Sequence, residues 1–198
     1  MTRILDTLRG ICLALDSAQA QWALVGGLAV GMRAEPRNTR DVDVCLAVGS
    51  DAEAEALVYS LTGLGYRQGT VIEQTSLGRL ATVRLHPPGQ GPRGVLVDLL
   101  FASSGIEREV VGAAERLELL PSLVVPVASL AHLISLKVLA RDDRRRPQDI
   151  LDLKALLAVA NGSDLATART ALGLVAQRGF HRNKNLDLEL DRAISELS

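Results

Sequence analysis

WALVGGLAVGMRAEPRNTRDVDVCLAV, which runs from Trp22 to Val48, decides the fold of this chain of 198 residues. Its first four residues form a short apolar run that predicts a strand, and Gly26-Gly27 predicts a turn directly after it. A brief helix and a polar loop follow, and the pattern from Asp41 onward predicts a second strand. The stretch therefore predicts two strands joined through a glycine turn and a short helix.

Asp41 and Asp43 stand two residues apart in the second predicted strand. Because side chains of a strand alternate between its faces, both carboxylates project to one side, while Val42 and Val44 enter the core on the other. Adjacent like charges repel one another, and strands disfavour aspartate. A divalent cation such as Mg²⁺, which carboxylates hold together with substrate phosphates, would account for the pair. The alternative is an edge strand whose acids are simply solvated.

The Gly26-Gly27 turn lies between an apolar strand and an apolar helical stretch. Glycines let the bare backbone approach a ligand closely, and N–H groups at the start of a helix point toward an anion. A phosphate site and a metal site are therefore expected side by side. Neither the P-loop pattern nor the G-x-G-x-x-G pattern occurs at this turn, which argues against a P-loop or Rossmann nucleotide binder.

The two glycines and the later run Arg37-Asn38-Thr39-Arg40-Asp41-Val42-Asp43 resemble the signature of polymerase-β-type nucleotidyltransferases. Within that superfamily, the chain is similar to the AbiEii/AbiGii toxin-type nucleotidyltransferases. The resemblance implies that Asp41 and Asp43 bind metal. It also implies nucleotide contacts from Gly26, Gly27, Arg37, Thr39 and Arg40. One departure is Gly27, where many relatives have Ser, so a hydroxyl that could contact a phosphate is absent.

Asp98 is the single acid in GVLVDLLFA, an apolar run from Gly94 to Ala102 that predicts a buried strand. A buried acid is costly unless it is paired or bound to a metal, so Asp98 needs a partner. The resemblance implies a third carboxylate on a strand next to the Asp41–Asp43 strand, where Asp98 would complete the metal site. Alternatively, Asp98 lies at the exposed end of its strand or pairs with an arginine such as Arg84.

Lys137 is the first cation after a long uncharged run and lies in the apolar helical stretch LAHLISLKVLA. A buried lysine must find an anion or lose its proton. Asp149 and Asp152 follow on one face of a predicted helix. In AbiEii-type proteins a helix lysine and an R-P/K-x-D-x-x-D-L stretch form the second half of the active site, and Lys137 with Arg146–Leu153 is similar to them. The alternatives are that Asp149 stabilises the helix N-terminus and that Asp152 pairs with Lys137 or Arg146.

Composition bounds the class of protein. Hydrophobic residues make up 47% of the chain and aromatic residues 3%, which indicates a core of Leu, Val, Ala and Ile. The 22 basic and 23 acidic residues balance, so the total charge does not require nucleic acid as a partner. Two cysteines in apolar runs are expected to be buried free thiols, and three dispersed histidines argue against a zinc site. Without a recognisable signal peptide or membrane-length segment, we expect a cytoplasmic protein that does not associate with membranes.

The order of the predicted elements gives an α+β fold, in which a mixed β-sheet is flanked by helices and followed by a C-terminal helical bundle. This is the nucleotidyltransferase fold that the resemblance implies. We expect an α/β core over residues 1–127 and a helical region over 128–198 that completes the site. Outside the central stretch, helices are expected at 2–19, 52–61 and 106–115, strands at 66–72 and 79–85, and a strand or extended connector at 117–127.

The resemblance implies an enzyme that moves a nucleoside monophosphate from an NTP to an acceptor hydroxyl, with Mg²⁺ or Mn²⁺ held by Asp41, Asp43 and Asp98. Asp98 would activate the acceptor as a base or by completing a second metal site. Lys137 would neutralise phosphate charge, and Asp149 or Asp152 would orient Lys137 or the nucleotide.

The motif residues do not identify the acceptor of the nucleotide. By resemblance it is a tRNA 3′ end, a protein hydroxyl or a small molecule such as an aminoglycoside, and a toxin would have a cognate antitoxin as partner. Arg40, Arg141 and the cluster Arg144–Arg146 are candidates for holding an RNA backbone, although such charges are more often a solvated surface. The alternative from another class is a non-catalytic binding module that keeps the fold.

Overall fold

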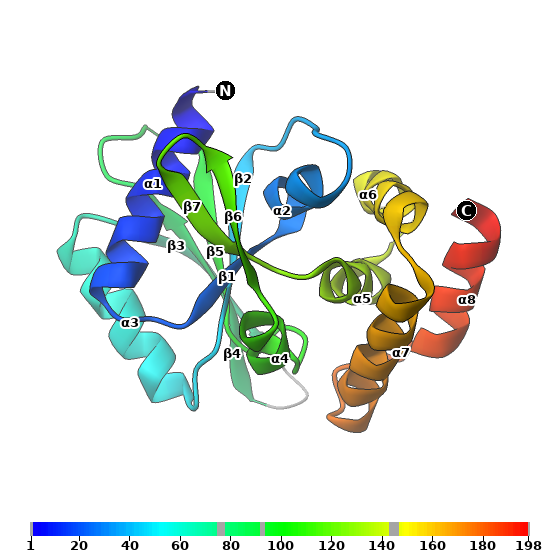
Figure 1. Ribbon diagram of the computed structural model, residues 1–198. Coiled ribbons are helices and arrows are strands. Elements are labelled where there is room, and N and C mark those ends of the chain that lie inside the picture. Colours follow the sequence, from blue (N-terminus) through cyan, green and yellow to red (C-terminus); the bar gives the residue numbers. More distant parts are fainter. Residues whose placement is uncertain (1, 75–77, 92–93, 143–146, 198) are drawn as a thin grey trace.

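The structure, a computed structural model, describes residues 2–74, 78–91, 94–142 and 147–197 (Figure 1). The arginines at 144–146, which were candidates for RNA contact and for the second half of the site, lie outside these ranges. The helices are α1 (Thr2–Ser17), α2 (Gly26–Arg33), α3 (Asp51–Gly63), α4 (Glu107–Gly112), α5 (Leu130–Ala140), α6 (Pro147–Val159), α7 (Gly162–Gln177) and α8 (Leu186–Leu197). The strands are β1 (Trp22–Val25), β2 (Asp41–Leu46), β3 (Arg67–Gln74), β4 (Arg79–His86), β5 (Leu96–Leu100), β6 (Glu115–Leu120) and β7 (Leu123–Val127).

The strands of the described part of the chain form one mixed sheet in the order β3-β4-β5-β2-β1-β7-β6. β2 runs parallel to β5 and β1 runs parallel to β7, whereas the other neighbouring pairs are antiparallel. The register places Asp43 beside Asp98 on β5 and opposite Val25 on β1. The predicted α+β class and mixed sheet are confirmed, and the three candidate metal-binding acids lie on two adjacent central strands.

β2 sorts its side chains between the two faces of the sheet as predicted. Val42 and Val44 are fully buried, whereas Asp41 and Asp43 remain partly exposed. On α1, the fully buried Leu8, Ile11 and Leu15 follow helical spacing and form part of the hydrophobic core. Burial of each of these aliphatic side chains stabilises the folded state by roughly 1.5–3 kcal/mol. The core can therefore hold β2 and its two acids in position.

The helices fall into two groups around the sheet (Figure 1). α1 and α3 lie against one side, and α5 to α8 gather on the opposite side beyond α2. α6 packs beside α2, which brings the Asp149 helix to the end of the sheet that carries Asp41. The division of the chain at residue 127 stays a prediction, although β7 ends at Val127 and the helices of the second group follow it.

Two stretches differ from the sequence prediction. Glu115 belongs to β6 rather than to the preceding helix, and the connector expected at 117–127 is a β-hairpin of β6 and β7. In the turn of this hairpin Ser122 has φ 66°, a left-handed conformation that a serine in the sequence does not predict. In addition, β3 is an edge strand exposed on both faces, and its Val71 and Ile72 are 40% and 54% exposed.

Candidate active site

Gly26 and Asp43 occupy one compact corner at the start of α2. Gly26 has φ 65°, which a residue with a Cβ rarely adopts. A Cβ built on Gly26 would lie only 1.9 Å from Oδ2 of Asp43. The Asp43 carboxylate therefore fills the space that a side chain at position 26 would need, and the glycine brings bare helix-terminal backbone next to an acid.

Asp98 is engaged by an arginine from the next strand. Nε and Nη2 of Arg84 on β4 donate to the two carboxylate oxygens of Asp98, at 2.8 and 2.7 Å. The side chains of Arg84 and Asp98 are 39% and 14% exposed. Thus Asp98 has the arginine partner that was the alternative to metal binding, while it also occupies the predicted strand next to β2.

Burial and the charge of Asp98 raise the pKa of both acids on β2. Burial, followed by repulsion from Asp98, raises the pKa of Asp43 to about 7. The same two causes, in the same order, raise the pKa of Asp41. The positive charges of Arg84 and Lys137 oppose the shift at Asp43. The corner therefore holds excess negative charge that a cation would stabilise.

These residues fit a hard divalent cation by their chemistry, since carboxylate oxygens are the ligands that Mg²⁺ and Mn²⁺ prefer. The fit is supported by the electrostatic repulsion that Asp98 and Asp41 exert on Asp43, and by the guanidinium that is paired with Asp98. Within the described ranges, no three acidic, histidine or cysteine side chains converge closely enough to bind a metal. In this structure Asp98 is paired with Arg84.

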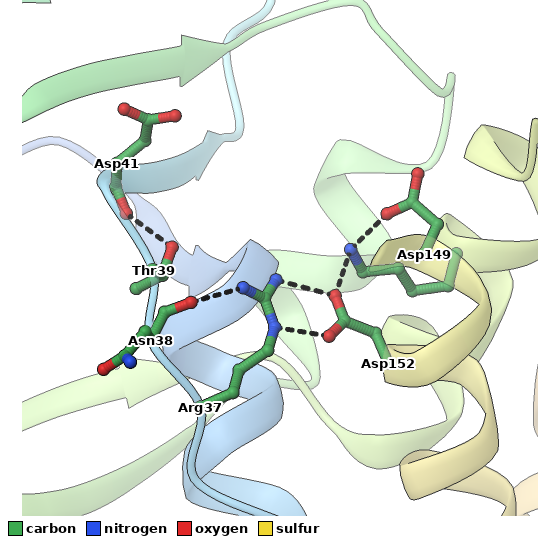
Figure 2. Close-up of polar contacts among 7 residues, drawn as sticks. Arg37, Asn38, Thr39, Asp41, Asp149 and Asp152 are labelled. Atoms are coloured by element: carbon green, nitrogen blue, oxygen red, sulfur yellow. Dashed lines mark hydrogen bonds and ion pairs between the residues drawn. The ribbon is translucent and has the colours of Figure 1, made fainter. Parts of the chain in front are cut away.

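A network of charges forms the second half of the candidate site (Figure 2). Nζ of Lys137 on α5 lies 2.6 Å from Oδ1 of Asp149 and 2.7 Å from Oδ2 of Asp152, both on α6. Arg37, from the loop before β2, donates from Nη2 to Oδ2 of Asp152 at 2.8 Å and from Nε to Oδ1. Asp152 is 1% exposed, so this network is buried at its centre. It joins the loop that carries the R-x-T-x-D-x-D sequence to the C-terminal helices.

Asp152 is held ionised by its partners. Burial alone would raise the pKa of Asp152, but the hydrogen bonds from Arg37 and Lys137 outweigh it and lower the pKa below its ordinary value of 3.8. The predicted pairing of Asp152 with Lys137 is thus present, and Arg37 supplies a second cation that we did not expect there. Asp149 is buried beside Lys137 in the first turn of α6, where an acid also suits the helix dipole.

The predicted nucleotide-contacting residues lie close to Gly27 and Asp41. A Cβ on Gly27 would come within 2.5 Å of Nη2 of Arg37 and 2.9 Å of Oγ1 of Thr39, so both side chains pack over this glycine. Thr39 donates to the backbone oxygen of Asp41 at 3.4 Å (Figure 2), and Arg40 is exposed. A serine at position 27 would force Arg37 to move. The nucleotide contacts of these residues stay predictions.

Residues 7–197 match the family model described as nucleotidyl transferase AbiEii toxin, type IV toxin–antitoxin system. The chain belongs to this family. It is therefore an enzyme of the nucleotidyltransferase class. No curated protein sequence matches it.

Solved structures of nucleotidyltransferases share the fold of this AbiEii family member. An antigenic nucleotidyltransferase-like protein from Paracoccidioides brasiliensis aligns with TM-score 0.54 and 21% identity, over 96% of this chain and 93% of its own. ANT(2″)-Ia in complex with adenylyl-2″-tobramycin aligns with TM-score 0.51 and 14% identity over the whole of both chains. Lincomycin-bound LnuA, a lincosamide antibiotic adenylyltransferase, aligns with TM-score 0.51 and 12% identity, over 77% of this chain and 96% of its own.

A contact between the segment that follows α7 and the region of α4 was not predicted from the sequence. Arg178 pairs with Glu109 on α4 at 2.6 Å, and Arg182 donates to the backbone oxygen of Ser103 at 3.0 Å. Between them, Phe180 packs over Gly105, where a Cβ would lie 2.3 Å from the ring. In the sequence these residues form the pattern Gly179-Phe180-x-Arg182, which by itself indicates no partner. This contact joins the C-terminal helices to the region of α4, and the Arg37–Asp152 pair joins them to the loop before β2.

In the part of the chain that the structure describes, no helix is both long and apolar enough to span a membrane.

Proposed function

We propose that this chain transfers a nucleoside monophosphate from an NTP to a hydroxyl of RNA, in a reaction that depends on Mg²⁺ or Mn²⁺, and that it acts as a toxin restrained by a cognate antitoxin. The single observation that supports metal dependence best is the placement of Asp41, Asp43 and Asp98 on two adjacent strands beside the glycine that begins α2. Membership of the AbiEii toxin family supports the toxin role and the antitoxin partner.

In this proposal each group of site residues has its own role in the reaction. Asp41, Asp43 and, once released from Arg84, Asp98 would hold the metal, which when bound stabilises negative charge on the reacting phosphate. Backbone N–H groups at the start of α2 would bind phosphate oxygens, because the exposed donors of a helix N-terminus favour anions. Lys137 would neutralise charge on the triphosphate, and Asp149 and Asp152 hold it in place. Asp98 is the candidate to accept the proton of the acceptor hydroxyl.

We propose the 3′ end of tRNA as the acceptor. Arg40 is exposed directly before Asp41, so it could contact a phosphate of an RNA strand that enters the site. ANT(2″)-Ia and LnuA, whose structures contain an adenylylated aminoglycoside and a lincosamide, share only the fold with this chain. A small-molecule acceptor is therefore the outcome against which the RNA proposal is tested.

The test incubates the purified chain with each α-labelled NTP, Mg²⁺ and total RNA. We expect label in tRNA-sized RNA from one NTP, a steep fall of transfer with rising salt, and loss of transfer in Asp43→Ala. The matched control is Asp191→Ala, which removes an exposed acid of α8 and should leave transfer unchanged. Label that enters no RNA, or an Asp43→Ala variant that retains most activity, would overturn the proposal.

A further inference from the structure

Arg84 completes a row of charged residues across three neighbouring strands. The antiparallel register of β4 and β5 places Arg84 beside Asp98, and the parallel register of β5 and β2 places Asp98 beside Asp43. Because these positions are paired directly, their side chains lie on the same face of the sheet. The guanidinium thus approaches the acidic corner from the side opposite to Gly26.

The Arg84–Asp98 contact uses both oxygens of the carboxylate. Two nearly equal hydrogen bonds of 2.8 and 2.7 Å form the fork that guanidinium and carboxylate groups make when they face each other in one plane. An acid held in this way is oriented toward the arginine. This agrees with the finding that no three potential metal ligands converge among the described residues. The arginine and a metal therefore compete for the same acid.

We propose that Arg84 is a positioning residue that holds Asp98 out of the metal site and yields it when the metal binds, so that the Arg84–Asp98 pair sets the affinity for the metal. This inference rests on the proposed function, in which Asp98 is the third carboxylate of the metal site. The side chain of Arg84 is 39% exposed, so the pair is partly solvated and can be exchanged at small cost. Released arginine would remain next to the site as a cation.

The test is a Mn²⁺ titration of the purified full chain, followed by the electron paramagnetic resonance signal of free Mn²⁺. We expect Arg84→Gln to bind Mn²⁺ about 1.5- to fivefold more tightly than the wild type, because a partly exposed ion pair is worth about that factor. Arg84→Lys, which keeps the charge but loses the fork, should show a smaller gain. The matched control is Arg79→Gln, because Arg79 lies on the same strand, donates from Nε to Asp51 and is 38% exposed. It should bind Mn²⁺ like the wild type.

The double variant Arg84→Gln with Asp98→Asn tests whether Arg84 acts through Asp98. Its Mn²⁺ affinity should equal that of Asp98→Asn alone, so that the gain disappears with the acid. The circular dichroism spectra of Arg84→Gln and Arg84→Lys should match that of the wild type, which shows that both variants are folded. If both then bind Mn²⁺ no more tightly than the wild type, the role of Arg84 is overturned and the proposed transferase activity is unaffected. Absence of saturable Mn²⁺ binding in the wild type and in every variant would overturn the metal site, and this inference with it.

Discussion

Asp152 provides a prediction whose magnitude follows from the geometry. The change is Asp152→Asn, which keeps the shape of the side chain but removes its charge. Asp152 is 1% exposed and faces two cations, Arg37 and Lys137, whose side chains are 23% and 13% exposed. In the variant the amide N–H₂ group would point at a donor, and the two cations would lose a shared counter-ion.

Breaking a buried ion pair costs about 3–5 kcal/mol, since the remaining charge has neither water nor a partner. Here Asp149 still neutralises Lys137 at 2.6 Å, and Arg37 reaches some solvent. We therefore expect Asp152→Asn to lower the free energy of unfolding by about 2–4 kcal/mol. The same change should also impair transfer, because Lys137 loses one of the two acids that orient it.

Urea unfolding at neutral pH measures the loss, with the m-value checked for an unchanged two-state transition. The matched control is Asp191→Asn, whose partner Arg169 is 45% exposed, and it should change the free energy of unfolding by less than about 0.5 kcal/mol. A double-mutant cycle with Arg37→Gln should give a coupling free energy of about 1 kcal/mol or more. An Asp152→Asn protein as stable as Asp191→Asn would refute the reasoning, because the network would then contribute nothing to the fold.

Three further predictions concern the glycine, the acid range and the metal. Gly26→Ala should abolish transfer and lower the free energy of unfolding by about 1–3 kcal/mol, because the new Cβ would lie 1.9 Å from Oδ2 of Asp43. The control is Gly78→Ala, where φ is also positive at 60° but the Cβ meets no atom, so only the backbone strain should lower the stability. The pKa of Asp152 is lowered below 3.8 in the folded state, so its ionised carboxylate stabilises the fold fully above pH 3.8, and this stabilisation is lost as the pH falls through the folded pKa. The difference in unfolding free energy between the wild type and Asp152→Asn should therefore shrink across that acid range. Chelation by EDTA should stop transfer, and Mg²⁺ should restore it, without a change in the circular dichroism spectrum, because aliphatic residues such as Leu8 and Ile11 form the core.

The strands and acids of the candidate site could be predicted because local patterns encode them. Alternation of acid and valine in β2 gives both the strand and the face on which Asp41 and Asp43 lie. A lone acid in an apolar run marks Asp98, and a lone cation in an apolar helix marks Lys137. Each of these signals arises because burial makes a charged side chain costly, so a charge in an apolar segment has to have a partner.

The identity of each partner was harder to predict, because it depends on how distant segments pack. Asp98 could pair with a metal or with Arg84, and only the register of β4 against β5 shows that Arg84 lies beside it. The nucleotide contact of Arg37 stays a prediction, and its bond to an acid 115 residues away was not expected. The β6–β7 hairpin was missed for a local reason, since Ser122 adopts a positive φ that sequence patterns assign to glycine or asparagine.

The Arg37–Asp152 pair also has a consequence for the order in which the site is made. Its two partners are separated by 115 residues, so at about 5–20 residues per second a ribosome adds them roughly 6–23 s apart. During that interval a growing chain carries Asp41, Asp43 and Asp98 but lacks the helix that binds Arg37 and Lys137. Translation itself therefore sets a delay before the chain can assemble the second half of its candidate site.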